Sequence, residues 1–381
     1  MIVAYKTDIC MIVHNDITHD SRVQKEATSL ASQGWNVLVV GIMLGNYVDI
    51  PQEETINGYR IKRVRPPFRA TGTFKKIIQL IITLPLVFLA LRSAKARSYH
   101  GHDFVGLLIL ALAGIWNTPI VYDSHELFFE QKNAFLPKNV KLIGQKVEKY
   151  LAQRSVKTIT VSEGIAKEFV QRYQIESVVV RNLIDLRTIQ QQSALSYNTA
   201  DKKVIVHSGS ITFGRHLPEL ISALPYLSDN VILVLMGDGS LSTSLVAQAK
   251  TLGVSEKLKI VRSVQPNEVV ATLAQADVGL ALITSEFLSY YYALPNKFFE
   301  SISAGLPVLT SQNPDMKALV EQYNIGLSCD PTNPESIADA IKEILIPENY
   351  AHYKANVDIA RQDLTWEHEE KKLIAIYKAI L

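Results

Sequence analysis

The sequence predicts an α/β protein with two doubly wound domains in tandem. Short apolar runs alternate with longer helical patterns, as in repeated strand–helix–strand units with mainly parallel sheets. The 381 residues also exceed what one hydrophobic core normally serves. A polar stretch over 186–203 separates two such series, so we expect it to link domains at 1–185 and 204–365.

The first series contains six candidate strands and two helices with recognisable ends. The strands are expected at 9–13, 36–41, 59–64, 119–122, 158–161 and 177–180. A helix over 20–33 should end before Gly34, because glycine commonly follows a helix C-terminus. A second helix over 163–173 should begin after Ser162, a favourable N-cap. Residues 98–101 are interpreted as a turn.

The second series repeats the pattern of the first. Its strands are expected at 204–208, 231–236, 258–261, 278–282 and 307–309. A last helix over 366–380 follows, within a C-terminal segment 366–381 that we expect to pack back on the first domain. Because ligands of open α/β sheets bind beyond the carboxyl ends of the strands, the residues that follow strands are the candidates for function.

The composition is that of an ordinary globular protein, with 48% hydrophobic and 20% charged residues. Cys10 and Cys329 are the only cysteines and lie far apart, which provides neither a disulfide framework nor a four-ligand zinc set. The N-terminus reaches Lys6 and Asp8 without the apolar core of a signal peptide. We expect a cytoplasmic protein, and we expect no nucleic-acid partner.

A basic segment, residues 60–97, lies in a stretch between Thr55 and His102 that has no Asp or Glu. Its positive residues are Arg60, Lys62, Arg63, Arg65, Arg69, Lys75, Lys76, Arg92, Lys95 and Arg97. The apolar run 77–91 within it is interrupted by Pro85 and is too short to span a bilayer comfortably. Two interpretations are open: an interfacial segment that meets anionic lipid at the inner face of the cytoplasmic membrane, or a buried helix with a solvated basic rim.

The most informative motif is LPNKFFESISAGLPV, residues 294–308. Pro295 suits the first turn of a helix, whose free amides and the charge of Lys297 would form a phosphate site. The amides expected to be free are those of Asn296, Lys297 and Phe298. The carboxylate of Glu300 would accept hydrogen bonds from the two hydroxyls of a ribose. The alternative is a helix whose Lys and Glu are merely solvated.

This motif resembles the retaining glycosyltransferases of family 4, which have the GT-B fold. The family pattern is a Glu, seven residues, a second Glu and then Ala-x-Ala-x-Gly-x-Pro-Val. Here the second Glu falls on Glu300, whereas Tyr292 stands at the first position, which in the family contacts the transferred sugar. Glu286 in the preceding loop is a candidate to compensate. The resemblance covers 20–366 and implies two Rossmann-like domains facing across a cleft, with the nucleotide sugar bound by the second.

A second stretch, HSGSITFGRHLPELISAL at 207–224, resembles the family's Gly-Arg-Leu followed by Lys-Gly and a helix. On this resemblance Gly209 keeps a tight turn, and Arg215 stands where a Lys neutralises the diphosphate. Ser210 replaces the family's Arg, so Lys297 is expected to supply the missing charge, because departure of the diphosphate without a metal needs about two positive charges. The alternative for Arg215 is a surface arginine at a helix start.

The turn at Gly237 resembles the family's Gly-x-Gly near the donor, although a simple turn explains it equally well. In the N-terminal half, Asp-Ser-His-Glu at 123–126 matches the family's Asp-x-His-Glu, which implies that His125 lies over the reacting sugar. The alternative for His125 is a loop or packing residue. His102 and Asp103 resemble the family's His-Asp pair on the acceptor side. We expect no metal site, because the clustered spacing of a metal-dependent hydrolase is not repeated elsewhere.

The first connection between strand and helix, HNDITHDSR at 14–22, is expected on the acceptor side. The run from Asp20 to Val23 matches a pattern common in one branch of the family. Arg22 is therefore a candidate contact to phosphate or acceptor; the alternative is a helix N-terminal residue that binds no ligand.

The resemblance implies transfer of a sugar from a nucleoside-diphosphate sugar, with UDP favoured, to a hydroxyl of a glycan or lipid-linked acceptor in cell-surface polysaccharide synthesis. His125, Arg215 and Lys297 would act at the reaction, without metal or cofactor. In the family the leaving phosphate itself takes the acceptor proton, in agreement with the absence of an obvious carboxylate pair. Two rival interpretations are a nucleotide-sugar 2-epimerase and a non-catalytic binding protein, the latter because Ser210 and Tyr292 replace donor contacts.

Overall fold

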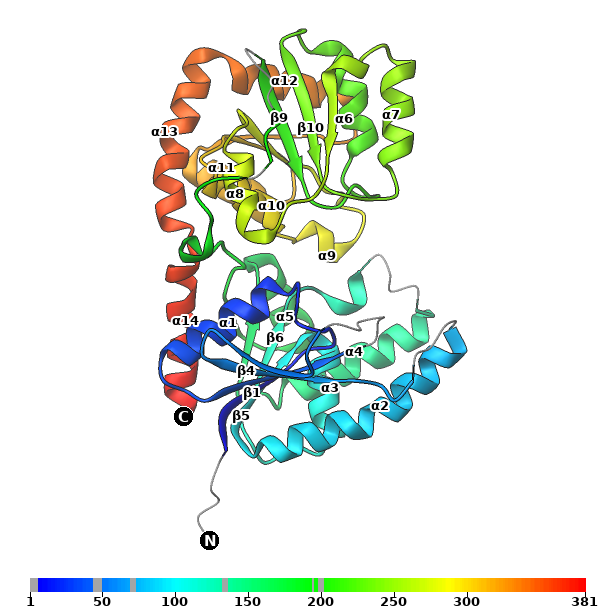
Figure 1. The fold of residues 1–381 in the computed structure, drawn as a ribbon, viewed down its shortest axis with the longest axis vertical. Helices are drawn as coiled ribbons and strands as arrows, with labels where there is room; N and C mark the ends of the chain where they lie inside the picture. The colour runs from blue at the N-terminus through cyan, green and yellow to red at the C-terminus, as the bar shows by residue number, and fades with distance from the viewer. Residues whose placement is uncertain (1–5, 44–49, 69–72, 132–135, 194, 198–201) are drawn as a thin grey trace. The chain divides into compact units, whose positions relative to one another are not determined.

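The computed structural model describes residues 6–43, 50–68, 73–131, 136–193, 195–197 and 202–381. Its contacts divide the chain into two compact units (Figure 1). Unit 1 consists of Met1–Val180 together with Glu369–Leu381, and unit 2 is Arg181–His368. The division falls shortly before residue 185, the boundary expected from the sequence.

Unit 1 is built on an eight-stranded sheet in the order β3-β4-β2-β1-β5-β6-β7-β8. The strands are β1 Thr7–Ile12, β2 Val37–Ile42, β3 Glu53–Ile56, β4 Tyr59–Val64, β5 Ala96–His102, β6 Ile120–Ser124, β7 Lys157–Thr160 and β8 Ser177–Val179. The strands pair in parallel, apart from β3, which is antiparallel to β4. The strand order reverses beside β1, so the carboxyl ends of β1 and β5 form the switch point where open α/β sheets bind ligands.

The helices of unit 1 are α1 Ser21–Ser32, α2 Thr73–Ala94, α3 Asp103–Leu112, η1 Phe128–Glu130, α4 Lys138–Ala152 and α5 Glu163–Tyr173, followed later by the C-terminal part of α14 Trp366–Ile380. Two of these helices, α1 and α5, begin at capping side chains. The side chain of Asp20 caps α1 by accepting a hydrogen bond from the amide of Val23 (3.2 Å). Ser162 caps α5 in the same way, and Gly34 follows α1 with a φ of +85°.

The last helix, α14, has the bounds expected from the sequence, and Glu369–Leu381 belongs to unit 1. Leu373 and Tyr377 are fully buried there. Glu370 accepts a hydrogen bond from the hydroxyl of Ser29 on α1, which lies beside α14 in Figure 1. The C-terminus of the chain therefore completes the core of the unit in which the chain begins.

Unit 2 is built on a six-stranded parallel sheet in the order β11-β10-β9-β12-β13-β14. The strands are β9 Lys203–Ser208, β10 Val231–Met236, β11 Leu258–Val261, β12 Val278–Ala281, β13 Val308–Ser311 and β14 Gly326–Cys329. The helices are η2 Leu186–Thr188, α6 Leu217–Ala223, η3 Leu224–Tyr226, α7 Ser242–Thr251, η4 Ser255–Lys257, η5 Pro266–Glu268, α8 Val269–Leu273, α9 Leu288–Tyr291, α10 Asn296–Ser303, α11 Pro314–Tyr323, α12 Pro334–Leu345 and α13 Pro347–Asp363.

The sheet of unit 2 is covered on both faces. Leu233 and Leu235 of β10 pack in one apolar cluster with α6, α7 and α12, whereas Val234 and Met236 belong to another cluster that contains α8 residues. Because neighbouring side chains of a strand point to opposite faces, these two clusters lie on opposite sides of the sheet. The carboxyl ends of its central strands are left to carry loops.

The interpretation of residues 98–101 as a turn is wrong, since they are the interior of β5. Ser98 and His100 are fully buried on this strand. Polar residues and Gly101 hid it from a search for apolar runs. The short strands β3 and β14 were also absent from the expected set, because β3 is mostly exposed and β14, with the sequence GLSC, is not a continuous apolar run.

Part of the segment 186–203, expected to be a linker, packs on unit 2. Tyr197 is fully buried, and its hydroxyl donates to the carbonyl of Thr272 (2.5 Å). Residues 194 and 198–201 lie outside the described residues.

Candidate functional site

The donor-side residues predicted from the sequence gather in unit 2, where β9 ends and α10 begins. The hydroxyl of Ser208 donates a hydrogen bond to Glu300 Oε2 (3.0 Å), and Lys297 Nζ lies 3.1 Å from His207 Nε2. Gly209 follows directly, and a Cβ placed on it would lie 4.0 Å from Lys297 Cε. The two motifs, separated by about ninety residues in sequence, therefore form one site at the switch point beside β9.

The electrostatics of this site centre on Lys297, which is only 7% exposed. Burial lowers the pKa of its ammonium well below the ordinary value, and Arg215 lowers it further, against the opposing effect of Glu300. Burial and Lys297 likewise lower the pKa of His207, which is therefore neutral. An anion placed beside Lys297 and Arg215 would favour the charged form of the lysine.

The N-terminus of α10 differs in detail from the expectation. Pro295 is the N-cap rather than the first helical residue, and the amide of Phe298 donates to the Pro295 carbonyl (3.0 Å). The Phe298 amide is therefore not available to a phosphate, and its side chain is buried in the core. Asn296 and Lys297 contribute the first amides of the helix, and Asn296 Oδ1 accepts a hydrogen bond from Asn182 Nδ2 (2.9 Å).

Two glycine turns let the loops after β9 and β10 touch each other. Gly209 has a φ of +101°, and its amide donates to the Met236 carbonyl (2.9 Å). A Cβ on Gly237 would lie 2.0 Å from the Gly209 carbonyl oxygen, so only glycine fits there. Gly237 thus packs against the Gly209 loop. This packing role agrees with the interpretation of Gly237 as part of a simple turn.

Arg215 lies on the loop between β9 and α6, which also carries the exposed Ser210. Its guanidinium carbon lies 5.4 Å from the centre of the Tyr290 ring. The carbonyl of Gly214 accepts a hydrogen bond from the amide of Thr284 (3.0 Å), which ties this loop to the one after β12. Arg215 is near enough to Lys297 to influence its pKa, so the predicted pair of cations is brought together.

The position of the family's first Glu is occupied by Tyr292, the C-cap of α9. Its ring packs edge-on against Tyr291, with centroids 4.9 Å apart. Glu286 is exposed on the preceding loop, and its amide lies 3.3 Å from the Thr284 hydroxyl. In the segment that follows β12, an aromatic residue therefore stands where the family pattern has a Glu.

The acceptor-side residues predicted from the sequence gather in unit 1, around Asp123 of β6. Arg22 binds both carboxylate oxygens of Asp123 (2.7 and 2.8 Å) and also donates to the Val180 carbonyl (2.8 Å). It lies 3.0 Å from Glu26, one helical turn further along α1. Arg22 is 3% exposed and is the buried partner of Asp123, which agrees with the alternative of a residue at the start of a helix that binds no ligand.

His125 is the partly exposed member of this group, with 20% of its side chain accessible. Its Nε2 lies 3.0 Å from Asp123 Oδ2, and its Nδ1 lies 3.4 Å from Asp103 Oδ2. Asp103 also accepts a hydrogen bond from the amide of His125 (3.0 Å). Burial alone would lower the pKa of His125, but Asp103 and Asp123 outweigh it and raise the pKa to about 10.

The histidines of β5 lie beneath His125. His102 Nδ1 is 3.1 Å from His125 Nε2, and the His100 ring stacks on His102 with centroids 4.3 Å apart. Burial and the neighbouring His100 lower the pKa of His102 to about 3, and burial also lowers the pKa of His100. Burial would raise the pKa of Asp123, but Arg22 and His125 hold it well below its usual range. His125 is thus charged, whereas the two histidines of β5, His100 and His102, are neutral.

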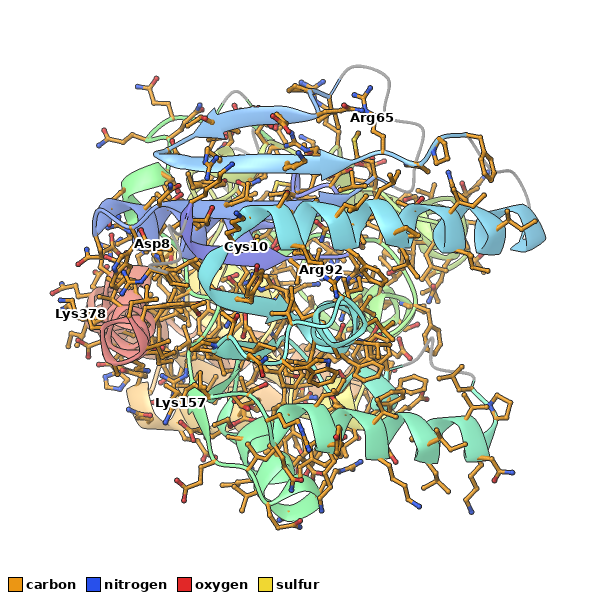
Figure 2. The ribbon with its side chains drawn as sticks, turned by 90° about the horizontal axis from the view of Figure 1, so that it is seen from below. Asp8, Cys10, Arg65, Arg92, Lys157 and Lys378 are labelled. Atoms are coloured by element: carbon orange, nitrogen blue, oxygen red, sulfur yellow. The ribbon has the colours of Figure 1, made fainter. Side chains whose placement is uncertain are left out.

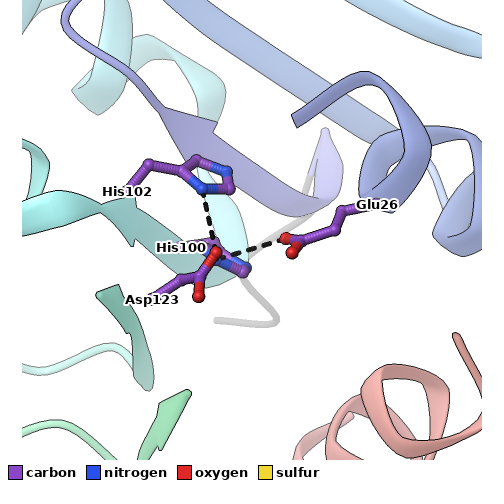
Figure 3. Close-up of side chains that lie close together, drawn as sticks. All are labelled: Glu26, His100, His102 and Asp123. Carbon is purple, nitrogen blue, oxygen red and sulfur yellow. Dashed lines mark ion pairs between the residues drawn. The ribbon is translucent and has the colours of Figure 1, made fainter. Parts of the chain in front are cut away.

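Four residues of unit 1 have the chemistry of metal ligands: Glu26, His100, His102 and Asp123 (Figure 3). One ligand atom from each lies within 4.8 Å of the others, and all four are buried. However, Arg22 already binds both oxygens of Asp123, so a metal ion would have to displace a buried guanidinium that neutralises the same carboxylates. In this structure the cation bound to Asp123 is the guanidinium of Arg22.

Sequence reasoning did not find Glu26, His100 and Tyr377 of this cluster. His100 was hidden in the segment taken for a turn, and Tyr377 joins from α14, far along the chain, with its hydroxyl 2.7 Å from His100 Nδ1. A signal for Glu26 was present, since it lies four residues after Arg22 on the buried side of α1.

The basic segment is only partly a free positive surface. Arg63 is buried and donates to the Asp16 and Pro51 carbonyls, while Arg97 pairs with Asp8. Arg92, another positive residue of the basic segment, is exposed; Figure 2 labels it in a view onto α2. Arg69 and the side chains of Lys75 and Lys76 lie outside the described residues.

The apolar run of helix α2 is partly buried and partly exposed, so it has features of both the buried helix and the interfacial segment. Val87 and Leu91 are fully buried, whereas four apolar side chains are exposed. The exposed ones are Ile81 (61%), Ile82 (43%), Leu86 (42%) and Leu89 (65%). Among the described helices, none is long and apolar enough to cross a membrane.

Comparison with known proteins gives matches along nearly the whole chain. The family model for glycosyltransferase family 4 matches residues 21–188, and the model for glycosyl transferases group 1 matches 190–360. An uncharacterized glycosyltransferase of Methanocaldococcus jannaschii is 23% identical over 353 residues, which are 87% of each chain.

Solved structures share the fold at low sequence identity. Sucrose-phosphate synthase from Thermosynechococcus elongatus has a TM-score of 0.79 at 17% identity and covers 98% of this chain and 99% of its own. Anabaena HepE in complex with UDP-glucose has a TM-score of 0.74 at 16% identity, covering 98% and 100%.

Proposed function

Because the chain belongs to the glycosyltransferases of family 4, whose fold it has, we propose that it transfers a sugar from a nucleoside-diphosphate sugar to a hydroxyl of a glycan or lipid-linked acceptor. We take the donor to be a UDP-sugar and the anomeric configuration to be retained. The observation that carries the proposal is the meeting of Lys297, Glu300 and the Gly209 loop at the end of β9.

The donor site has the charge that a leaving diphosphate needs. Lys297, Arg215 and the N-terminus of α10 together offer about two positive charges, enough to stabilise the diphosphate without a metal. Glu300 is held in place by the Ser208 hydroxyl, and we assign its carboxylate to accept hydrogen bonds from the ribose. Lys297 is buried without a carboxylate in direct contact among the described residues, which favours an incoming anion.

The protonation state of His125 restricts the role that it can have in the reaction. With a pKa of about 10 it is protonated at neutral pH, so it cannot serve as the base that takes the acceptor proton. We assign it instead to polarising oxygen groups of the transferred sugar. The acceptor proton then goes to the leaving phosphate, as in the family mechanism.

The acceptor side of the proposal includes a membrane. The exposed apolar side chains of α2, with Arg92 and Lys95 at its end, suit an anionic lipid surface. Helix α4 presents a similar row, since Val140 and Ile143 are exposed there among four lysines. We place the enzyme in the cytoplasm, at the inner face of the cytoplasmic membrane, in the synthesis of cell-surface polysaccharide.

The substitutions Ser210 and Tyr292 favour one rival, a protein that binds a nucleotide sugar or glycan without turnover. The test is a thermal-shift and sugar-transfer screen of the full chain against UDP-, GDP-, ADP- and TDP-sugars with EDTA present. We expect one nucleotide series to raise the melting temperature and to be consumed. Binding without consumption of any donor, with and without acceptor glycans, would support the rival.

The matched variants for this screen are Glu300→Ala and Glu335→Ala. Both residues lie in the first turns of helices of unit 2, but Glu335 belongs to α12 and is exposed. Stabilisation by the nucleotide should be lost in Glu300→Ala and kept in Glu335→Ala. Equal loss in both variants would show that Glu300 does not hold the ribose.

A further inference from the structure

A buried contact joins the last helix of unit 1 to the histidine cluster. Tyr377 on α14 is fully buried, and its hydroxyl lies 2.7 Å from Nδ1 of His100, which is fully buried too. The Tyr377 ring also packs near Trp35, with centroids 6.1 Å apart. The hydroxyl is therefore held where it can only serve the imidazole, and the proposed transfer chemistry does not use it.

The acceptor oxygen Asp123 Oδ2 is shared by every basic group of the cluster. Its neighbours are Arg22 Nε at 2.8 Å, His125 Nε2 at 3.0 Å, His102 Nδ1 at 3.3 Å and His100 Nε2 at 3.8 Å. A carboxylate oxygen has two lone-pair directions, so it cannot accept good hydrogen bonds from all four. The positions of protons on the three imidazoles consequently depend on one another.

The most favourable arrangement follows from the two shortest contacts. If Arg22 and the protonated His125 donate to Asp123 Oδ2, the facing Nδ1 of His102 must carry a lone pair, 3.1 Å from His125 Nε2. If Nδ1 of His102 carried a proton instead, its N–H group would face the N–H group of His125 and the two would repel each other. The tautomer of His102 is therefore coupled to the orientation of His125.

The tautomer of His102 also depends on the position of the neighbouring His100 ring. Its ring stacks on His102, and its Nε2 faces Glu26 Oε2 (3.6 Å) and Asp123 Oδ2 (3.8 Å). When Tyr377 donates its hydroxyl proton to Nδ1, the imidazole proton stands on Nε2 and points at these carboxyl groups. Without the hydroxyl, the ring can rotate or change tautomer against His102.

We propose that Tyr377 is a positioning residue for His125, acting through His100, His102 and the shared oxygen of Asp123. The docking of α14 on unit 1 then fixes the orientation of the one partly exposed imidazole of the cluster. The consequence for sugar transfer rests on the proposed function, whereas the coupling between Tyr377 and His125 does not.

The experiment compares Tyr377→Phe with two control variants of the full chain. Tyr173→Phe also removes a buried hydroxyl of unit 1, one that donates to Glu148 Oε2 (2.6 Å) away from the histidines. Leu373→Val loosens the packing of the buried side of α14 without touching a hydrogen bond. Histidine ring signals are followed by NMR between about pH 6 and 11, and His125→Gln and His102→Gln assign the two signals.

In Tyr377→Phe we expect the pKa of His125 to fall by about one unit, the scale of a lost charged hydrogen bond, and a second tautomer of His102 to become visible. Neither change should occur in Tyr173→Phe or Leu373→Val. With a donor identified, kcat should fall about tenfold while KM for the donor stays unchanged.

Two outcomes would overturn the proposal: unaltered histidine signals in Tyr377→Phe, or the same alteration in Leu373→Val, which would make Tyr377 a packing residue only. A wild-type protein that turns over no nucleotide sugar would instead count against the proposed function. The NMR result stands apart from that outcome, because it needs no substrate.

Discussion

The two groups of candidate residues differ in how their charges are balanced. In unit 1, Arg22 and Asp123 pair directly, and His125 stands between Asp103 and Asp123. In unit 2, burial and then Arg215 lower the pKa of Lys297, with Glu300 as the opposing carboxylate. The cluster of unit 1 is thus complete by itself, whereas the site of unit 2 gains from an added anion.

The largest effect should come from removing the buried cation of unit 2. In Lys297→Met we expect kcat/KM to fall by at least about 10²-fold, because a donor that stabilises the leaving group is lost. The free energy of unfolding without nucleotide should stay the same or rise, since a buried, disfavoured ammonium is replaced by an apolar chain. Steady-state kinetics and urea denaturation measure the two.

The control for that variant is Lys317→Met, at an exposed position of α11. It should keep both activity and stability. A clear loss of stability in Lys297→Met would contradict the view that the site is electrostatically unbalanced.

The opposite result is expected in unit 1, where charges satisfy each other. Asp123→Asn removes the charge of the carboxylate that Arg22 binds through both oxygens, and it should lower the free energy of unfolding by about 3–5 kcal/mol. Asp339→Asn breaks an exposed pair with Lys342 and should change it by less than about 1 kcal/mol. Urea denaturation that shows similar small effects for both would remove the distinction between the two groups.

The pH dependence of stability sharpens the comparison. The pKa of His125 is raised in the folded chain to about 10, so its stabilising contribution is complete below about pH 6.5 and disappears as the pH rises through 10. His125→Gln should be less stable than the wild type at pH 6 by up to about 3 kcal/mol, and the difference should vanish near pH 10.5. A difference that stays constant with pH would mean that His125 is not a charged member of the cluster.

The smallest effect on stability is expected at the exposed face of α2. Leu89→Gln should change the free energy of unfolding by no more than about 0.5 kcal/mol, because the side chain is 65% exposed. It should nevertheless weaken binding to vesicles of anionic phospholipid in a sedimentation assay. Ile359→Gln on α13, equally exposed at 62%, is the control and should bind as the wild type does.

Much of the fold could be predicted because its signals are local. The strands β4, β10 and β11 have the expected bounds, since each is a short apolar or alternating run. The strand β5 could not be found in this way, because its buried Ser98 and His100 are polar. His100 is accommodated inside unit 1 because Tyr377, a residue distant in sequence, contacts its Nδ1.

The two sites differ in the same respect. The donor site lies mostly in one continuous motif, 294–308, so the proximity of Lys297 and Glu300 was predictable. The cluster of unit 1 assembles α1, β5, β6 and α14, and no local pattern shows that Arg22 meets Asp123. For that reason the sequence left two interpretations of Arg22 open, a contact to phosphate or acceptor and a residue that binds no ligand, and did not indicate that Arg22 is a buried counter-ion.

The most direct test of the anion-binding claim for unit 2 is the proton balance of UDP binding. Calorimetric titration at pH 8, in buffers of different ionisation enthalpy and with EDTA, measures the protons exchanged for each UDP bound. Because an added diphosphate favours the charged form of Lys297, we expect the wild type to take up protons on binding and Lys297→Met to take up none. Binding without proton uptake, or uptake that persists in Lys297→Met, would contradict the account.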